Sequence, residues 1–88
     1  MKLDVRYFAQ VREALGPGET CAWPDEEAGR PLTVGQLRAW LIGRSPQHAA
    51  ALDLSIPLRA ACNQLMCHPD ELLVDGAEVA FFPPVTGG

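Results

Sequence analysis

Apolar and polar residues alternate along the first segment of the chain. Between residues 2 and 8, Leu3, Val5 and Tyr7 are separated by charged residues. A period of two with β-branched and aromatic side chains is typical of a strand with one buried face. The pattern therefore predicts a strand over residues 2–8.

A helical turn and a second strand are expected next. Residues 9–15 form a mixed stretch that suits a helical turn, and residues 16–18 (Gly-Pro-Gly) force a turn. Residues 19–23 then return as a strand and complete an N-terminal hairpin. The acidic segment over residues 24–31 is interpreted as a solvated loop.

The clearest local pattern is that of a helix over residues 34–42. Thr33 and Gln36 have the spacing of a capping box, and Gly43 suits a C-terminal cap. Apolar residues recur at i, i+3 and i+7, which predicts one buried stripe. Trp40 widens this stripe and is interpreted as a core residue.

The second half of the chain predicts further strands. Residues 48–54 fit a short helix or a loop, and residues 58–65 fit a strand, although Asn63 and Gln64 are suited to a turn. After a turn signal at Asp75-Gly76, residues 78–82 alternate as the last strand. The predicted order β-β-α-β-(β)-β is the α+β arrangement of a β-grasp domain, with a mixed sheet packed against one main helix.

Six residues follow the last predicted strand: Pro83, Pro84, Val85, Thr86, Gly87 and Gly88. The prolines stop the strand and favour an extended chain, and the glycines make its end flexible. At ~3.3 Å per residue, this segment reaches about 20 Å. We therefore expect a β-grasp domain over residues 1–82 and an extended, flexible C-terminal Gly-Gly tail over residues 83–88.

The terminal carboxylate is the candidate reactive group. Its pKa lies near ~3.5, so it is ionised at neutral pH and is a poor electrophile. It has to be activated, for instance as an acyl-adenylate made from ATP. The sequence lacks a Walker-type glycine-rich loop, so another protein is expected to perform this step.

Charge and cysteine content narrow the candidate partners and ligands. The 88 residues suffice for one domain, the net charge is −4, and the seven lysines and arginines are scattered. We expect neither nucleic-acid nor membrane binding, because both need a concentrated basic face. A protein partner with a basic acceptor site fits better. The N-terminus has no pattern of a signal peptide, so a cytoplasmic location is expected.

Cys21, Cys62 and Cys67 are an odd number of cysteines and do not suggest a disulfide framework. His68 follows Cys67, but no C-x-x-C pair supports a zinc site. We predict free thiols that are buried or half-buried, no metal site and no bound cofactor.

Three segments resemble the small, sulfur-carrier subunit of molybdopterin synthase, a ubiquitin-like β-grasp family. They are residues 7–13 (YFAQVRE), residues 61–64 (ACNQ) and residues 75–88 (DGAEVAFFPPVTGG). The last segment is the most specific. The sequence departs from the family pattern at Cys62, where an apolar residue such as valine is usual, and in the acidic loop over residues 24–31.

This resemblance implies a mechanism. An E1-like adenylyltransferase uses ATP to form an acyl-adenylate on Gly88, and a sulfur donor protein converts it to a thiocarboxylate. The tail, with Gly87, Thr86 and Val85, then enters a channel of the large catalytic subunit, where the sulfur is transferred to precursor Z. The implied assembly is a heterotetramer of two small and two large subunits, in which this chain is a sulfur-donating subunit and the large subunit is catalytic.

Docking to a partner also needs a surface, and we expect it at the base of the tail, where apolar residues lie on or beside the ends of strands. Phe8, Phe82, Pro83 and Pro84 are the candidate partner-binding residues, with an aromatic anchor beside the tail. Phe81 is interpreted as core, whereas Phe82 fits the core and the docking surface equally well.

Three other functions are compatible with a β-grasp domain that ends in Gly-Gly. A thiamin-pathway sulfur carrier shares the fold and the Gly-Gly end, but the Phe-Phe-Pro-Pro-Val-Thr block over residues 81–86 favours the molybdopterin branch. A ubiquitin-like modifier is disfavoured because Lys2 is the sole lysine, so that chains of the protein could hardly form. A non-carrier β-grasp binding module with an inert tail is the third.

Overall fold

The computed structural model describes residues 1–23 and 32–84. Within these residues the element order is β1 (Lys2–Tyr7), α1 (Ala9–Leu15), β2 (Gly18–Ala22), β3 (Leu32–Thr33), α2 (Val34–Ile42), α3 (Pro46–Leu52), β4 (Arg59–Cys62), β5 (Leu65–Cys67), β6 (Leu72–Leu73) and β7 (Glu78–Phe82). The loop predicted over residues 24–31 and the end of the predicted tail, residues 85–88, lie outside the described residues.

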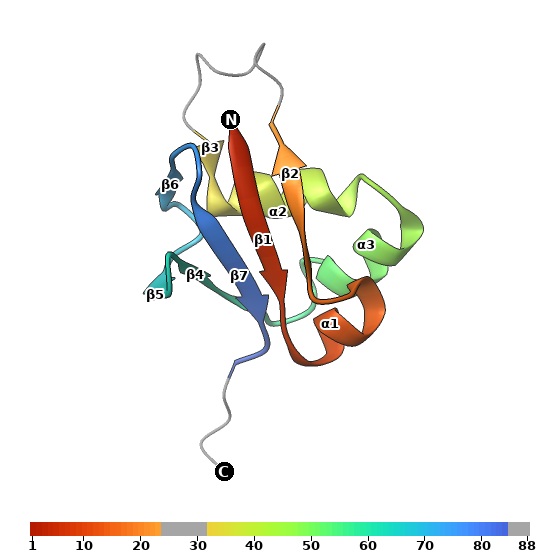
Figure 1. Ribbon diagram of the computed structural model, residues 1–88. Coiled ribbons are helices and arrows are strands. Elements are labelled where there is room, and N and C mark those ends of the chain that lie inside the picture. Colours follow the sequence, from red (N-terminus) through yellow and green to blue (C-terminus); the bar gives the residue numbers. More distant parts are fainter. Residues whose placement is uncertain (24–31, 85–88) are drawn as a thin grey trace.

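The first and last strands are neighbours in the middle of a mixed sheet. The order of its strands is β2-β1-β7-β4-β5, in which β1 and β7 run parallel and the other pairs are antiparallel. Helix α2 crosses one face of this sheet, and α1 and α3 pack beside it (Figure 1). The predicted α+β, β-grasp arrangement is confirmed.

The core lies between this face of the sheet and α2. Side chains alternate in burial along β1 and β7, and the inward row includes Val5, Tyr7, Val79 and Phe81. The buried residues of α2 are those of the predicted stripe, Val34, Leu37 and Leu41. Trp40, at the edge of this stripe, is half-buried against the core and stacks edge-on with Trp23 at a centroid distance of 5.6 Å.

The predicted capping box begins α2. The Gln36 N–H donates to Thr33 Oγ1 at 3.1 Å, and the Thr33 N–H donates to Gln36 Oε1 at 2.9 Å. Two backbone N–H groups that a helix start leaves unpaired are thereby satisfied. Among the described residues no helix is long and apolar enough to cross a bilayer.

Two predicted elements have different bounds in the structure, and one small sheet was not predicted. The strand over residues 58–65 is broken, because Asn63 and Gln64 adopt positive φ angles of 50° and 70° and form a two-residue turn between β4 and β5. Helix α3 begins at Pro46, capped by Ser45, and ends at Leu52 rather than spanning residues 48–54. The small β3–β6 sheet was not predicted, because strands of two residues are too short for a period to be detected.

Gly18 marks a close approach between β1 and β2 that yields a prediction. A Cβ atom at this position would overlap the Val5 carbonyl oxygen, which belongs to the strand backbone and has no room to yield. We expect Gly18→Ala to lower the free energy of unfolding by about 1–3 kcal/mol in urea denaturation. Gly43→Ala is the matched control, since its Cβ would meet only the Trp40 carbonyl oxygen at 3.5 Å. Equal stabilities of the two variants would contradict the close approach.

Candidate functional site

The parallel pairing of β1 and β7 places two aromatic residues at the base of the predicted tail. Tyr7 is in register with Phe81, and the Phe8 N–H donates to the Phe81 carbonyl oxygen at 3.2 Å. The C-terminal ends of β1 and β7 therefore lie next to each other, at the same end of the sheet (Figure 1). Because side chains alternate, Tyr7 and Phe81 face the core, whereas Phe8 and Phe82 face the other side of the sheet.

An apolar surface extends from these aromatic residues across the face of the sheet that none of the described helices covers, here called the uncovered face (Figure 1). Ala80 is in register with Ala61, and Ala61 with Met66, so these three residues form one row across β7, β4 and β5. Phe8 is 45% exposed and Met66 60%, while Phe82 is half-buried. We call this set the tail-base surface; it consists of Phe8, Ala61, Met66, Ala80 and Phe82.

The tail leaves from the edge of this surface. Pro83 and Pro84 directly follow β7 and are half-buried, and neither has an N–H with which to extend the ladder. Val85, Thr86, Gly87 and Gly88, predicted to deliver the reactive carboxylate, lie outside the described residues. The structure thus brings together the predicted docking residues Phe8, Phe82, Pro83 and Pro84, whose role stays a prediction.

Three members of this surface, Ala61, Met66 and Ala80, were not singled out from the sequence, and Met66 is the most exposed of them. Its position depends on the two-residue turn at Asn63–Gln64, which sets Met66 opposite Ala61. The sequence predicts a turn at Asn63–Gln64. Because side chains on the strand after this turn alternate between the two faces of the sheet, that prediction is enough to place Met66 on the uncovered face.

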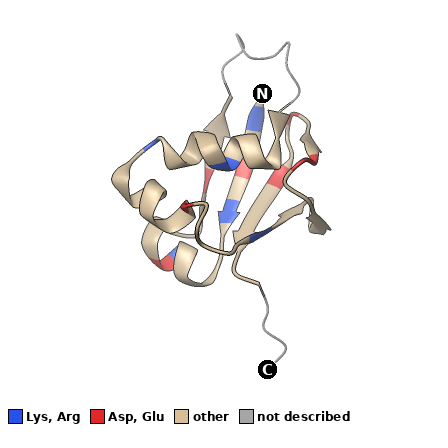
Figure 2. Ribbon diagram, turned by 180° about the vertical axis from the view of Figure 1, so that it is seen from behind, with Lys and Arg blue, Asp and Glu red and all other residues tan. Residues whose placement is uncertain are grey.

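The charges around the tail-base surface are mixed. Arg6, in register with Ala80, forms an ion pair with Asp4 at 3.0 Å and lies 3.8 Å from Glu78. Lysines and arginines are scattered among acidic residues over the described elements and do not collect on one of them (Figure 2). Such a surface suits a protein partner rather than a polyanion.

The buried end of β1 is held by Glu19. Its carboxylate accepts hydrogen bonds from the Tyr7 hydroxyl at 2.7 Å and from His48 Nε2 at 2.8 Å, and forms an ion pair with Arg44 at 2.8 Å. Ser45 Oγ, which caps α3, lies 2.7 Å from the other ring nitrogen of His48. Glu19 therefore connects β1 and β2 with the segment that begins α3. Because Tyr7 immediately precedes Phe8, these bonds fix the position from which Phe8 projects.

Competing effects act on the pKa of Glu19. Partial burial acts to raise it, but the hydrogen bonds from Tyr7 and His48, together with the charges of His48 and Arg44, outweigh burial and lower it below the ordinary value of 4.5. Desolvation and the neighbouring Glu19 carboxylate raise the pKa of Tyr7, so its phenol stays protonated and remains a donor.

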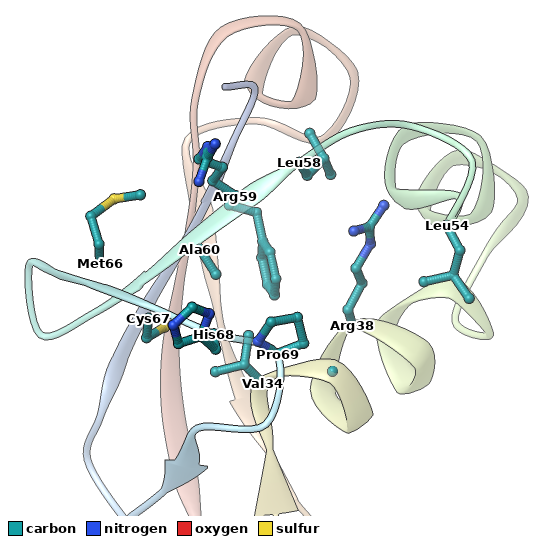
Figure 3. A pocket seen from close by; sticks show the side chains of 12 residues that line it. Val34, Arg38, Leu54, Leu58, Arg59, Ala60, Met66, Cys67, His68 and Pro69 are labelled. Carbon is teal, nitrogen blue, oxygen red and sulfur yellow. The ribbon is translucent and has the colours of Figure 1, made fainter. Parts of the chain in front are cut away.

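A pocket of about 210 Å³ lies between α2 and the β4–β5 hairpin. Arg38 and Leu54 line it from the helical side and Met66 and Cys67 from the hairpin (Figure 3). The Arg38 guanidinium donates to three carbonyl oxygens, those of Leu52, Asp53 and Ile56, at 2.6–2.9 Å. Arg38 therefore stabilises the conformation of the loop that follows α3, which is a structural role.

The cysteines agree with their prediction as free thiols. Cys21 is buried, and Cys62 and Cys67 are half-buried. Within residues 1–23 and 32–84, no group of three or more histidine, cysteine or acidic side chains is arranged to hold a metal ion.

The fold defines a β-grasp protein, with an apolar surface at the base of its C-terminal segment. Comparison with known proteins gives the particular family: residues 5–88 match the ThiS family, and the chain belongs to it.

Relatives and solved structures agree with this assignment. The chain is 45% identical over 86 residues to the molybdopterin synthase sulfur carrier subunit of Escherichia coli, covering 98% of this chain and 99% of the relative. A solved structure from Pyrococcus furiosus, assigned as molybdopterin converting factor subunit 1, is 26% identical with a TM-score of 0.73, covering 97% of this chain and 99% of that one. A complex of subunits 1 and 2 of molybdopterin-converting factor from Helicobacter pylori contains a chain of the same fold, with full coverage of both chains, 23% identity and a TM-score of 0.63.

The lowered pKa of Glu19 predicts how stability depends on pH. Since the folded state binds a proton at Glu19 less readily than the unfolded state, the stabilisation is complete above pH 4.5 and is lost as pH falls through the folded pKa. We expect Glu19→Gln to reduce the free energy of unfolding at neutral pH by about 1 kcal/mol and to flatten its decline in acid.

Denaturant titrations from neutral pH to below 4.5 would measure both effects. Glu13→Gln is the control, because Glu13 is exposed on α1. If the free energy of unfolding falls with pH in parallel for Glu19→Gln and the wild type, the Glu19 carboxylate does not stabilise the fold through its lowered pKa.

Proposed function

We propose that this chain is the sulfur carrier of a molybdopterin synthase, with Gly88 loaded as a thiocarboxylate. The observation that supports this most strongly is the 45% identity to the Escherichia coli sulfur carrier subunit over 98% of the chain. The match to the ThiS family extends to Gly88, so it includes the Gly-Gly end as well as the folded body.

Loading is assigned to other proteins. In an E1-like adenylyltransferase, a carboxylate oxygen of Gly88 attacks the α-phosphorus of ATP and pyrophosphate leaves. A sulfur donor protein then delivers sulfur at the oxidation level of sulfide, which attacks the acyl carbon and displaces AMP, so that a thiocarboxylate results. The mixed anhydride is needed because a free carboxylate is a poor electrophile, whereas AMP is a good leaving group.

A thiocarboxylate suits the delivery step. Its sulfur is nucleophilic enough to attack precursor Z in the large subunit, and the remaining acyl link is open to hydrolysis, which returns Gly88 to a carboxylate. Gly87 has no side chain, so a narrow channel admits it more readily than any residue with a Cβ. The chain thus donates sulfur, and the large subunit is the catalytic one.

Docking to the large subunit is assigned to the tail-base surface. Phe8 and Phe82 flank the point where the tail leaves the sheet, and the half-buried Pro83 and Pro84 continue it in extended form. The designation of the relatives as subunits supports a partner of this kind. We propose a heterotetramer of two small and two large subunits.

Loading at Gly88 can be measured directly by intact mass spectrometry. After incubation with the cognate adenylyltransferase, ATP and a sulfur source, we expect a mass shift that corresponds to replacement of one oxygen by sulfur, and fragment ions that locate it to Gly88. A chain lacking Gly88 is the control and should not shift, although it should still bind the large subunit. An unmodified wild-type C-terminus in the presence of active adenylyltransferase would contradict the proposal.

Docking through the tail-base surface predicts that Phe8→Ala weakens binding of the large subunit. An aromatic anchor at an interface contributes about 2 kcal/mol, so Kd should rise by about 30-fold in calorimetry. Leu54→Ala is the matched control, because Leu54 is also apolar and 70% exposed but lies on the helical side of the molecule. Equal effects of the two substitutions would rule out this surface as the docking site.

A further inference from the structure

Two cysteine side chains meet on the edge hairpin of the sheet. Cys62 ends β4, Cys67 ends β5, and the turn at Asn63–Gln64 joins the two strands. Their Sγ atoms are 3.0 Å apart. A disulfide bond measures about 2.04 Å, so the two sulfur atoms need to approach by only about 1 Å to form one.

The register places the two cysteines on the same face of the hairpin as diagonal neighbours, because Cys62 is opposite Leu65 and Cys67 is opposite Ala60. Cys67 is opposite Ala60, and Ala60 and Cys62 are two residues apart on β4, so all three lie on the core-facing side of the sheet. Both cysteines pack against the core, which restricts their rotamers and keeps the sulfur atoms together. Cys21, by contrast, is buried on β2, with an exposed fraction of 1%, at the opposite edge of the sheet.

A small reagent can reach this pair. Cys62 and Cys67 are half-buried, and both line a surface pocket of about 290 Å³ together with Glu71. Cys67 also lines the pocket on the α2 side of the hairpin (Figure 3). The Glu71 carboxylate favours a cationic or neutral oxidant over an anionic one.

We propose that Cys62 and Cys67 are a reversible dithiol–disulfide site that reacts with small organic disulfides. The first cysteine thiolate attacks a sulfur of the reagent, which breaks the S–S bond and releases one thiolate. The second cysteine then attacks the mixed disulfide, forms the Cys62–Cys67 bond and releases the second thiolate. The two cysteines lose two electrons and two protons in total, and the reagent is reduced to two thiols.

The environment of Cys62 affects how the bond closes. Burial, together with the hydrogen bond and charge of Cys67 and the charge of Glu71, raises the pKa of Cys62 to about 12. Once Cys67 is part of a mixed disulfide, its contributions to the raised pKa disappear, and Cys62 becomes the better nucleophile for closing the bond.

Closure of the bond would tie the edge strand β5 to β4. The cross-link would lie on the core side, whereas Met66 and the rest of the tail-base surface lie on the other side. Oxidation should therefore raise the midpoint of thermal unfolding without altering the exposed residues of that surface. This inference does not depend on the proposed sulfur-carrier function.

Cystamine, a dicationic disulfide, is the probe that tests the site. The reduced full-length chain in its carboxylate form is incubated with cystamine and analysed by intact mass and peptide mapping. We expect the loss of two hydrogens, no retained adduct, a Cys62–Cys67 link with Cys21 still free, and full reversal by dithiothreitol. Cys21→Ser should behave like the wild type, whereas Cys62→Ser and Cys67→Ser should retain a cystamine adduct on the remaining cysteine.

Three outcomes for the wild type would overturn the proposal. These are an unmodified chain, an adduct that persists on Cys62 or Cys67, and a link that involves Cys21. The result is decided by the wild-type chain alone, so it stands even if a serine variant fails to fold.

Discussion

The parallel pairing of β1 with β7 is the contact on which the rest of the structure depends. It joins the first and last strands at the centre of the sheet, with Val5 opposite Val79 and Tyr7 opposite Phe81, all of them buried. The hairpin of β1 and β2 extends the sheet on one side, and β4 and β5 extend it on the other. Because the pair is parallel, both strands finish at the same end of the sheet, so Phe8 and Phe82 both lie where the C-terminal segment begins.

This arrangement assigns separate tasks to the two faces of the sheet. The covered face is occupied by the core and by Glu19, which fixes the end of β1 through Tyr7. The uncovered face presents the tail-base surface, whose apolar row crosses three strands as far as Met66. A chain of 88 residues has little interior to spare for a catalytic pocket. A carrier that relies on partner enzymes for both loading and transfer is consistent with this limit.

Much of the fold could be predicted because its signals are local. The alternation in β1 and β7, the capping box of Thr33 and Gln36, and the stripe of α2 each occupy a few consecutive residues, and the structure confirms them. The break at Asn63–Gln64 was harder to place. Both residues adopt positive φ, and neither is a glycine that would have marked the turn clearly.

The parts of the site that the sequence did not predict depend on contacts between distant residues. Glu19 and His48 are 29 positions apart, and no local pattern links them. The pairing of Cys62 with Cys67 and the exposure of Met66 both follow from the hairpin register rather than from composition. The Gly-Gly end is identified from its resemblance to a family, because two terminal glycines alone do not distinguish a delivery arm from an ordinary terminus.

In the proposed reaction, the sulfur atom of the Gly88 thiocarboxylate becomes part of the pterin product. This transfer is tested most directly by loading Gly88 with isotopically labelled sulfur, mixing the purified chain with its large subunit and precursor Z, and following the label by mass spectrometry. The account predicts that the label leaves Gly88 and appears in the pterin, while the chain returns to its carboxylate form. Product that contains unlabelled sulfur while the label stays on Gly88 would contradict it.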